Sequence, residues 1–187
     1  MTLEAYAKGR TEFRERVIAH KKTRIVHLGA HVSLLFEDEL TIRYQVQEML
    51  RAERIFEEEG IAGELDAYNP LVPDGSNWKA TMMIEYPDAE ERRVMLAKLI
   101  GIEDRLWVQI RGFPRVYAIA DEDLERETGE KTSAVHFLRF ELKPAMIAAL
   151  RQGSPIGAGV DHPQYSVAVD ALDAAVTASL LGDLAAR

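Results

Sequence analysis

The sequence predicts an α+β fold: a single domain in which an antiparallel or mixed β-sheet packs with several α-helices. Two pairs of short apolar runs lie only a few residues apart, a spacing typical of β-hairpins. The run Trp78–Tyr86 alternates apolar and polar side chains, which indicates a strand with one buried face. Helical segments do not alternate regularly with single strands, as a doubly wound parallel sheet requires. The 187 residues suffice for one globular domain, residues 1–187, with a full core.

The chain begins with a basic helical segment, residues 1–22. A helix is predicted at Thr11–Lys22, with Thr11 as its N-cap and Gly9 separating it from a short first turn. The side chains expected to face inward are Phe13, Val17 and Ile18. This segment is therefore expected to pack one face of its helix on the rest of the domain.

A hairpin and a long helix follow. Arg24–Leu28 and Val32–Phe36 are two β-like runs on either side of Gly29, which favours a hairpin. Glu37–Glu59 has the periodicity of one long amphipathic helix. Because glycine destabilises a helix interior, this helix is expected to break near Gly60 or Gly63.

The remaining elements follow from alternation, caps and turn residues. The predicted strands and extended runs are Trp78–Tyr86, Leu106–Ile110, Arg115–Ala120, Val135–Leu142 and Ile156–Val160, of which the second and third form a hairpin. The predicted helices run from a capping box at Asp88 and Glu91 to Gly101, from Pro144 to Gly153, and onward from caps at Asp170 and Asp173. The predicted connections are a loop at Asn69–Asn77, a short helix or loop at Asp121–Lys131, and a turn at Asp161–Pro163.

The long helix carries an acidic residue where its pattern predicts an apolar one. At 100° per residue, its apolar stripe consists of Ile42, Val46, Met49, Leu50 and Phe56. Glu53 falls near the centre of that stripe. A carboxylate in a core needs an arginine, a histidine, a metal ion or a proton beside it. Three interpretations stay open: an ion pair with Arg139 or Arg51 of another element or subunit, a metal-binding or catalytic role, and plain exposure.

Polar residues on the predicted strand Val135–Leu142 and in a loop add further candidates. His136 lies on one apolar face of the strand and Arg139 on the other, which predicts a central strand that is covered on both sides. His162 lies in a predicted turn, and functional residues concentrate in loops. The ligand-binding candidates are Glu48, Glu53, His136, Arg139 and His162.

The familiar catalytic and metal-binding motifs are missing from the sequence. With no cysteine, the chain cannot form disulfides, zinc ribbons or cysteine-held iron–sulfur clusters. No HExxH or ExxH pattern occurs, and the spacing of Gly153, Gly157 and Gly159 matches no phosphate-binding loop, so a turn explains these glycines. We therefore expect no cofactor and no stoichiometric metal.

The net charge of −8 is unevenly distributed along the chain. The first 27 residues contain seven Lys/Arg and three acidic residues, whereas the rest contains sixteen basic and twenty-eight acidic ones. Arg14, Lys21 and Lys22 are the interaction candidates on this basic segment, which contacts either an acidic partner or the protein's own acidic body. The acidic remainder makes nucleic-acid binding unlikely. Without a long apolar run or a signal-peptide pattern, no membrane association and a cytoplasmic location are expected.

Several motifs resemble those of one bacterial family. They are YQVQEMLRAERIFEEE (Tyr44–Glu59), SAVHFLRFEL (Ser133–Leu142) and GVDHPQY (Gly159–Tyr165), together with the basic FRERVIAHKKTRIVHLG and the segment Lys79–Glu85. In this order and spacing they resemble the family called domain of unknown function 3501 over nearly the whole chain. The resemblance implies no activity. It does imply a link to redox or oxidative-stress proteins, because such genes neighbour those of rubrerythrin-like and iron–sulfur proteins.

These observations predict an accessory or interaction protein of unassigned role that binds a protein partner and forms a homodimer. The alternative is a small metal- or ligand-binding enzyme built on the five ligand-binding candidates. A weaker alternative is a nucleic-acid-associated protein that acts through its basic N-terminal segment. Convergence of Glu53, His136 and His162 on one open pocket would favour the enzyme, and a sealed Glu53–Arg139 pair would favour the accessory protein.

Overall fold

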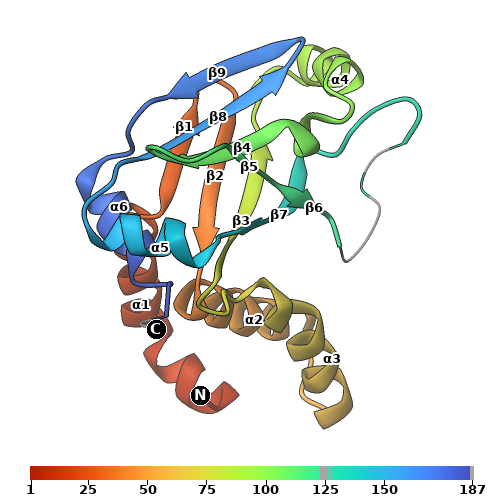
Figure 1. The fold of residues 1–187 in the computed structure, drawn as a ribbon. Coiled ribbons are helices and arrows are strands. Elements are labelled where there is room, and N and C mark those ends of the chain that lie inside the picture. The colour runs from red at the N-terminus through yellow and green to blue at the C-terminus, as the bar shows by residue number, and fades with distance from the viewer. Residues whose placement is uncertain (123–125, 127, 186–187) are drawn as a thin grey trace.

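Two antiparallel β-sheets form the body of the protein in the computed structural model, which describes residues 1–122, 126 and 128–185 (Figure 1). The larger sheet has the strand order β1-β2-β3-β7-β6, and the smaller one has the order β5-β4-β8-β9. The strands are β1 (Ile25–Leu28), β2 (Val32–Glu37), β3 (Asn77–Ile84), β4 (Leu106–Ile110), β5 (Val116–Tyr117), β6 (Ile119–Ala120), β7 (Val135–Glu141), β8 (Ile156–His162) and β9 (Tyr165–Val169). The predicted α+β fold is confirmed, and two sheets take the place of the one that the sequence predicts.

The two sheets share one hydrophobic core. β3 shows the predicted alternation, since Trp78, Ala80, Met82 and Ile84 are buried and the side chains between them are only partly buried. The buried faces of β2, β4, β7 and β8 supply most of the remaining core side chains. Helices α4 (Ala89–Lys98), α5 (Pro144–Arg151) and α6 (Ala174–Leu181) each add buried residues to the same core.

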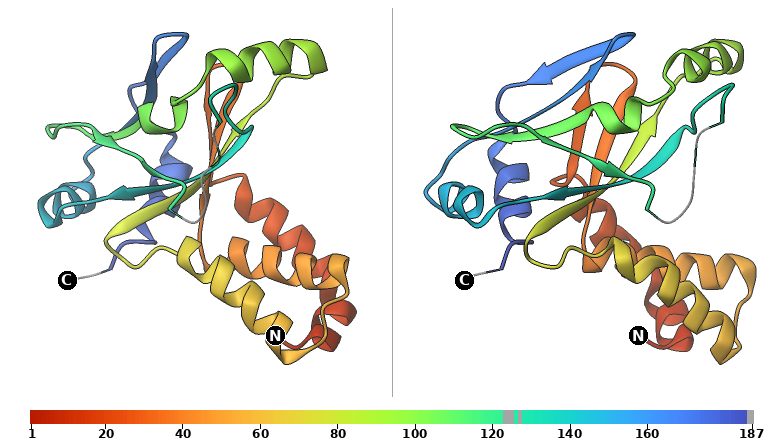
Figure 2. Two further views of the ribbon diagram at one scale, coloured as in Figure 1. Left: turned by 90° about the vertical axis from the view of Figure 1, so that its right-hand side faces the viewer. Right: turned by 45° about the vertical axis from the view of Figure 1, so that its right-hand side comes forward.

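Three helices extend from one end of the body, as Figure 2 shows. They are α1 (Leu3–Lys21), α2 (Glu39–Glu53) and α3 (Glu58–Tyr68), and we call them the helical arm. α2 packs against both α1 and α3. The arm has a small core of its own around Ile42, Val46 and Leu50, separate from the core between the sheets.

The prediction of one long helix at Glu37–Glu59 is wrong, because α2 and α3 are separate helices. α2 ends at Glu53, since Arg54 adopts a left-handed backbone conformation with a φ of 58°. The predicted break points, Gly60 and Gly63, lie inside α3 instead. Left-handed helix ends are usually marked by glycine or asparagine, so an arginine in that conformation leaves no signal in the sequence.

The start of α1 also differs from the prediction. Thr2 caps the helix by accepting a hydrogen bond from the amide of residue 5, and the helix continues through Gly9, so the predicted start at Thr11 is wrong. Val17 is buried as predicted, but Ile18 is 47% exposed. No described helix, α1 included, combines the length and apolar character that a membrane span requires.

The second predicted hairpin is only partly right. β4 pairs with β5, but β6 pairs with β7 of the larger sheet, so the predicted strand at residues 115–120 divides between the two sheets. The predicted turn Asp161–Pro163 is also too long, because β8 extends to His162 and turns directly into β9. Because Asp161-His162-Pro163 was interpreted as a turn, β9 was not predicted. The side chains of β9 nevertheless alternate between half-buried and exposed.

Two glycines lie inside β8, where the sequence predicts a turn to explain them. A Cβ atom on Gly159 would lie 2.4 Å from Cζ2 of Trp107 and 2.5 Å from the backbone oxygen of Val167. A Cβ on Gly157 would lie 3.1 Å from the backbone oxygen of Val169. Glycine is therefore needed here because the Trp107 ring and the neighbouring strand approach the backbone closely.

Candidate functional site

The structure does not bring the five ligand-binding candidates together. Glu53 is exposed at the end of α2, so its predicted burial is wrong. The guanidinium of Arg139 binds Glu122 at 2.6–2.7 Å and also Glu141, so the predicted Glu53–Arg139 pair is wrong as well. Hydrogen bonds to these two carboxylates raise the pKa of Arg139 above its usual value. Val135, on the same face, is 37% exposed, so this strand is not covered on both sides.

Glu48 holds two helices of the arm together. Its carboxylate on α2 accepts two hydrogen bonds from Arg10 of α1, both 2.7 Å long. The hydroxyl of Tyr6, a buried residue of α1, donates a third at 2.5 Å. The hydrogen bonds from Arg10, opposed by partial burial and assisted by Tyr6, lower the pKa of Glu48 to about 2. Glu48 is therefore occupied by structural contacts.

Acidification is expected to loosen this contact. The pKa of Glu48 is lower in the folded protein, about 2, than the ordinary value of 4.5, so the ionised form favours folding. This stabilisation is complete above about pH 4.5 and is lost as the pH falls toward 2. Allowing for partial exposure, it amounts to about 1–2 kcal/mol. Urea unfolding of wild type and Glu48→Gln between pH 2 and 7 measures it: the difference between the two proteins should shrink at low pH, and a constant difference would contradict the assignment.

His162 is buried and satisfied by backbone groups. Its Nε2 lies 3.1 Å from the carbonyl oxygen of Ile100, and its Nδ1 lies 3.2 Å from the amide nitrogen of Gln164. A ring that donates from Nε2 and accepts at Nδ1 meets both requirements. The residue thus joins the end of β8 to the segment after α4.

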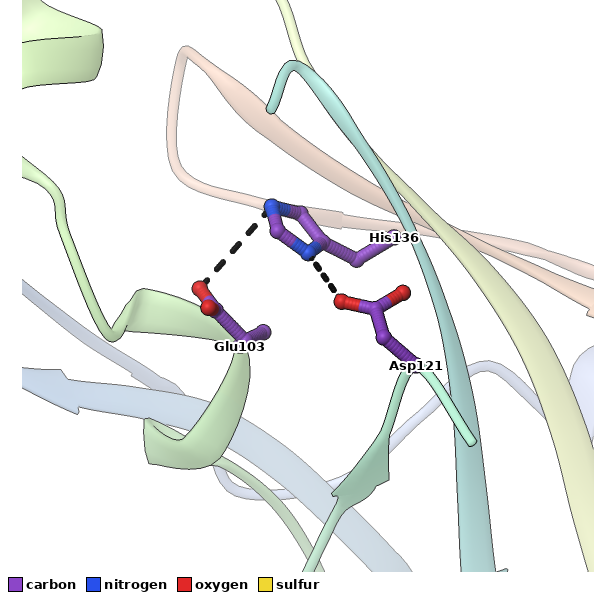
Figure 3. A group of neighbouring side chains, drawn as sticks. All are labelled: Glu103, Asp121 and His136. Carbon is purple, nitrogen blue, oxygen red and sulfur yellow. Dashed lines mark hydrogen bonds and ion pairs between the residues drawn. The ribbon is translucent and has the colours of Figure 1, made fainter. Parts of the chain in front are cut away.

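His136 is the candidate around which other polar groups gather (Figure 3). The ring is fully buried on β7, and its Nδ1 lies 2.5 Å from the carboxylate of Asp121. On the other side, Nε2 lies 2.8 Å from the hydroxyl of Thr132 and 3.0 Å from the carbonyl of Ser133. The carboxylate of Glu103, from the 3₁₀ turn η2 (Ile102–Arg105), lies 3.8 Å from Nε2. We call Glu103, Asp121, Thr132 and His136 the His136 cluster.

Chemically, the His136 cluster is a chain of hydrogen-bonding groups between two carboxylates. Oxygen atoms lie within hydrogen-bond distance of both ring nitrogens, so neither nitrogen is left without a polar neighbour. Thr132 lies 3.3 Å from Glu103 and links the ring to the second carboxylate.

Three residues of the His136 cluster also have the spacing of a metal site. Ligand atoms of Glu103, Asp121 and His136 all lie within 4.8 Å of one another, close enough to surround a cation. The two carboxylates, however, meet opposite nitrogens of the ring, and Thr132 holds the Nε2 side. Only Glu103 would share a cation with Nε2, with Asp121 as the outer group that orients the ring. The geometry therefore fits a hydrogen-bonded network better than a metal centre.

Sequence reasoning found His136 but missed its partners. Asp121 follows β6, has a φ of 46°, and accepts a hydrogen bond from the amide of Phe137. Aspartate tolerates this left-handed conformation better than most residues do. Glu103 comes from a different turn, and no periodic pattern relates either carboxylate to His136. Part of the predicted connection Asp121–Lys131, residues 123–125 and 127, lies outside the described residues.

A second charged network, also missed, joins the arm to the body. Arg24 is 1% exposed and donates to the backbone oxygens of Phe36 and Glu37 at 2.8 and 3.0 Å. It also binds Asp183 at 2.5 Å and lies 3.4 Å from Asp38, the N-cap of α2. Burial raises the pKa of Asp183, against the opposing effect of Arg24. This network fixes the position of α2 relative to β1, β2 and the segment after α6.

The three interaction candidates lie on α1 and just after it. Arg14 and Lys22 are exposed, and Lys21 is half-buried with its ammonium 5.8 Å from the centre of the Tyr44 ring. In a helix, residues four apart lie on one face, so Arg14 and Lys22 lie on either side of the exposed Ile18. Arg14 and Lys22 therefore present their charges to solvent, and contact of this segment with an acidic partner stays a prediction.

The helical arm also contains an open apolar cavity of about 590 Å³. It lies beside α2 and α3 and is closed on one side by the first residues of the chain. Its apolar lining residues are Met1, Leu3, Ile42, Val46, Leu50, Ile61, Leu65 and Val72. None of the five ligand-binding candidates lines it. We call this cavity the arm groove.

Comparison with known proteins confirms the resemblance noted from the sequence. The model of the family described as protein of unknown function (DUF3501) matches residues 1–184. The crystal structure of a novel protein of unknown function from Burkholderia pseudomallei K96243, at 1.90 Å resolution, matches with a TM-score of 0.94 and 60% sequence identity, over 99% of this chain and 96% of that one. A search of curated proteins gives no match. The chain therefore belongs to the DUF3501 family.

Proposed function

We propose that this is an accessory protein that acts by binding another protein chain through its helical arm. The observation that carries the proposal is the arm groove, an open and mainly apolar cavity of about 590 Å³. Exposed apolar surface is costly in water, and contiguous patches of it mark binding sites. The five residues of the enzyme alternative lie at separate places, so the geometry supports binding better than turnover.

Other features of the arm support a binding role. Large apolar side chains are exposed along it, including Phe56 at 67%, Ile18 at 47% and Leu65 at 41%. Phe56 belongs to the predicted apolar stripe but lies in the connection between α2 and α3, where the break after α2 turns it outward. The link to redox or oxidative-stress proteins that the resemblance implies makes such proteins the first partners to test.

Site-specific photocrosslinking in cells tests the proposal. A photoreactive amino acid is placed at Leu65, which lines the arm groove, and separately at Ile119 on β6 of the body. The two side chains are equally exposed, at 41% each, so they form a matched pair. Irradiation is expected to yield discrete protein adducts from position 65 and none of comparable yield from position 119.

Mass spectrometry of the adducts identifies the bound chain. Leu65→Asp, which places a charge in the groove, is expected to abolish capture from a second photoreactive position at Phe56. Equal adduct yields from positions 65 and 119, or the absence of adducts from position 65, would contradict a binding role for the arm.

A further inference from the structure

Two faces of the helical arm have complementary charge, and we infer that the chain bound in the arm groove is a second copy of this protein. In this arrangement the basic face of α1 from one copy lies against the apolar groove and the adjoining acidic α3 of the other. The inference rests on the proposed function and specifies its partner. A symmetric pair of arms satisfies both contacts at once, as isologous dimers do.

The first of the two contact faces is the patch around Ile18 on α1. Ile18 is 47% exposed, and Arg14 and Lys22 lie four residues away on either side, so all three share one face. Lys21 flanks the same face at i+3. The exposed Glu15 lies three residues before Ile18 on the same side, so the patch is mixed in charge but net basic. An exposed isoleucine within a net basic surface suits an apolar site with an acidic border.

The second contact face is α3, which borders the arm groove. Residues 57–68 contain five acidic side chains and no basic one. On the helical wheel, Glu58 and Glu64 lie about 60° to either side of Ile61, which lines the groove together with Leu65. The charged residues that line the groove itself are one acid and one base, Glu39 and Arg43, so the excess negative charge lies on the adjoining surface of α3. Its chemistry is the complement of the Ile18 patch in both charge and hydrophobicity.

The arm is accessible for such a pairing because it extends from one end of the body (Figure 2). α2 contacts both α1 and α3, and α1 is net basic whereas α3 is acidic. When two arms face each other about a twofold axis parallel to α2, each α1 meets the α3 of the other copy. Two identical contacts form, and each buries an Ile18 side chain.

Charge exchange with rescue tests the inference by analytical ultracentrifugation. Wild type is expected to sediment with twice the chain mass at micromolar concentration and to dissociate as salt is raised. Arg14→Glu/Lys22→Glu and Glu58→Lys/Glu64→Lys should each raise the dissociation constant about tenfold or more, because attraction becomes repulsion. Mixing the two variants should restore a dimer, since both of its contacts again pair opposite charges. Arg93→Glu, on exposed α4 away from the arm, serves as the control and should leave the mass unchanged.

The outcomes separate this inference from the proposed function. A wild-type protein that stays monomeric, or reversed variants that dimerise like wild type, would overturn the second-copy assignment. Adducts between position 65 and a different protein would then leave the arm's binding role standing. If a reversed variant loses its helical circular dichroism, the neutral pair Arg14→Gln/Lys22→Gln replaces it, with the same expected direction of change.

Discussion

Replacing Arg24 with alanine is expected to lower the free energy of unfolding by about 3–5 kcal/mol, one of the two largest single-residue effects we foresee. The guanidinium is 1% exposed and is the shared partner of Asp183, Asp38 and two backbone carbonyls. Its removal takes the guanidinium away from the carboxylate of Asp183 and from two buried carbonyls, whereas Asp38 keeps His20 and the amide of Thr41. The loss of a buried charged partner costs more than the intact network contributes. Urea unfolding followed by circular dichroism measures the change.

The matched control for Arg24 is Arg93→Ala. Arg93 forms an ion pair with Glu90 on the surface of α4, with both side chains about 70% exposed. Exposed ion pairs contribute little, so the unfolding midpoint of this variant should equal that of wild type within error. Because Arg24 connects the arm to the body, its loss should also expose the arm to proteolysis at low urea. An Arg24→Ala midpoint equal to the Arg93→Ala midpoint would show that the network is dispensable.

The substitution His136→Leu is expected to destabilise the protein by a similar amount, about 3–5 kcal/mol. Leucine fills much of the space but removes the polar ring that Asp121 and Thr132 contact, although Asp121 keeps its ion pair with Arg126 at 3.2 Å. Equilibrium urea unfolding at neutral pH measures the change. The control is His27→Leu, because His27 is an exposed histidine on the edge strand β1, and little change is expected there.

The variant Asp121→Asn distinguishes charge from shape in the His136 cluster. Asparagine retains the left-handed backbone and an acceptor oxygen for the amide of Phe137, so the lost stability reports the missing charge. A smaller loss than for His136→Leu is expected. A stoichiometric metal that is present in wild type and lost in both variants would instead make the cluster a metal site, against the hydrogen-bond geometry.

Local patterns predicted the elements that depend on neighbours in the chain. The alternation in β3, the hairpin of β1 and β2, and the cap of α4 by Asp88 all appear in the structure. Each depends on residues a few positions apart, so its signal is contained in a short window. The end of α2 was mispredicted because Arg54 carries no such signal, and this error displaced Glu53 from the expected core to the surface.

The contacts in the candidate sites could not be predicted from local patterns, because the residues that meet there are distant in the sequence. Arg24 and Asp183 are 159 positions apart, and Asp121 and His136 come from different segments of the larger sheet. Periodicity can show that a polar residue lies on an apolar face, as it did for His136. It cannot show which charged group meets it there, and it gave no indication that Arg24 is buried at all.

The sequence by itself determined the α+β class, the family, most of the strands, the cap of α4 and the basic character of the N-terminal segment. Each of these is set by composition or by short-range spacing. Only the tertiary structure decided that there are two sheets, that Glu48 and Arg139 are held in surface or interhelical ion pairs, and that an apolar groove opens beside the acidic α3. The physical reason is that burial and charge pairing are properties of the assembled core. They depend on which distant segments pack together, and no window of sequence contains that information.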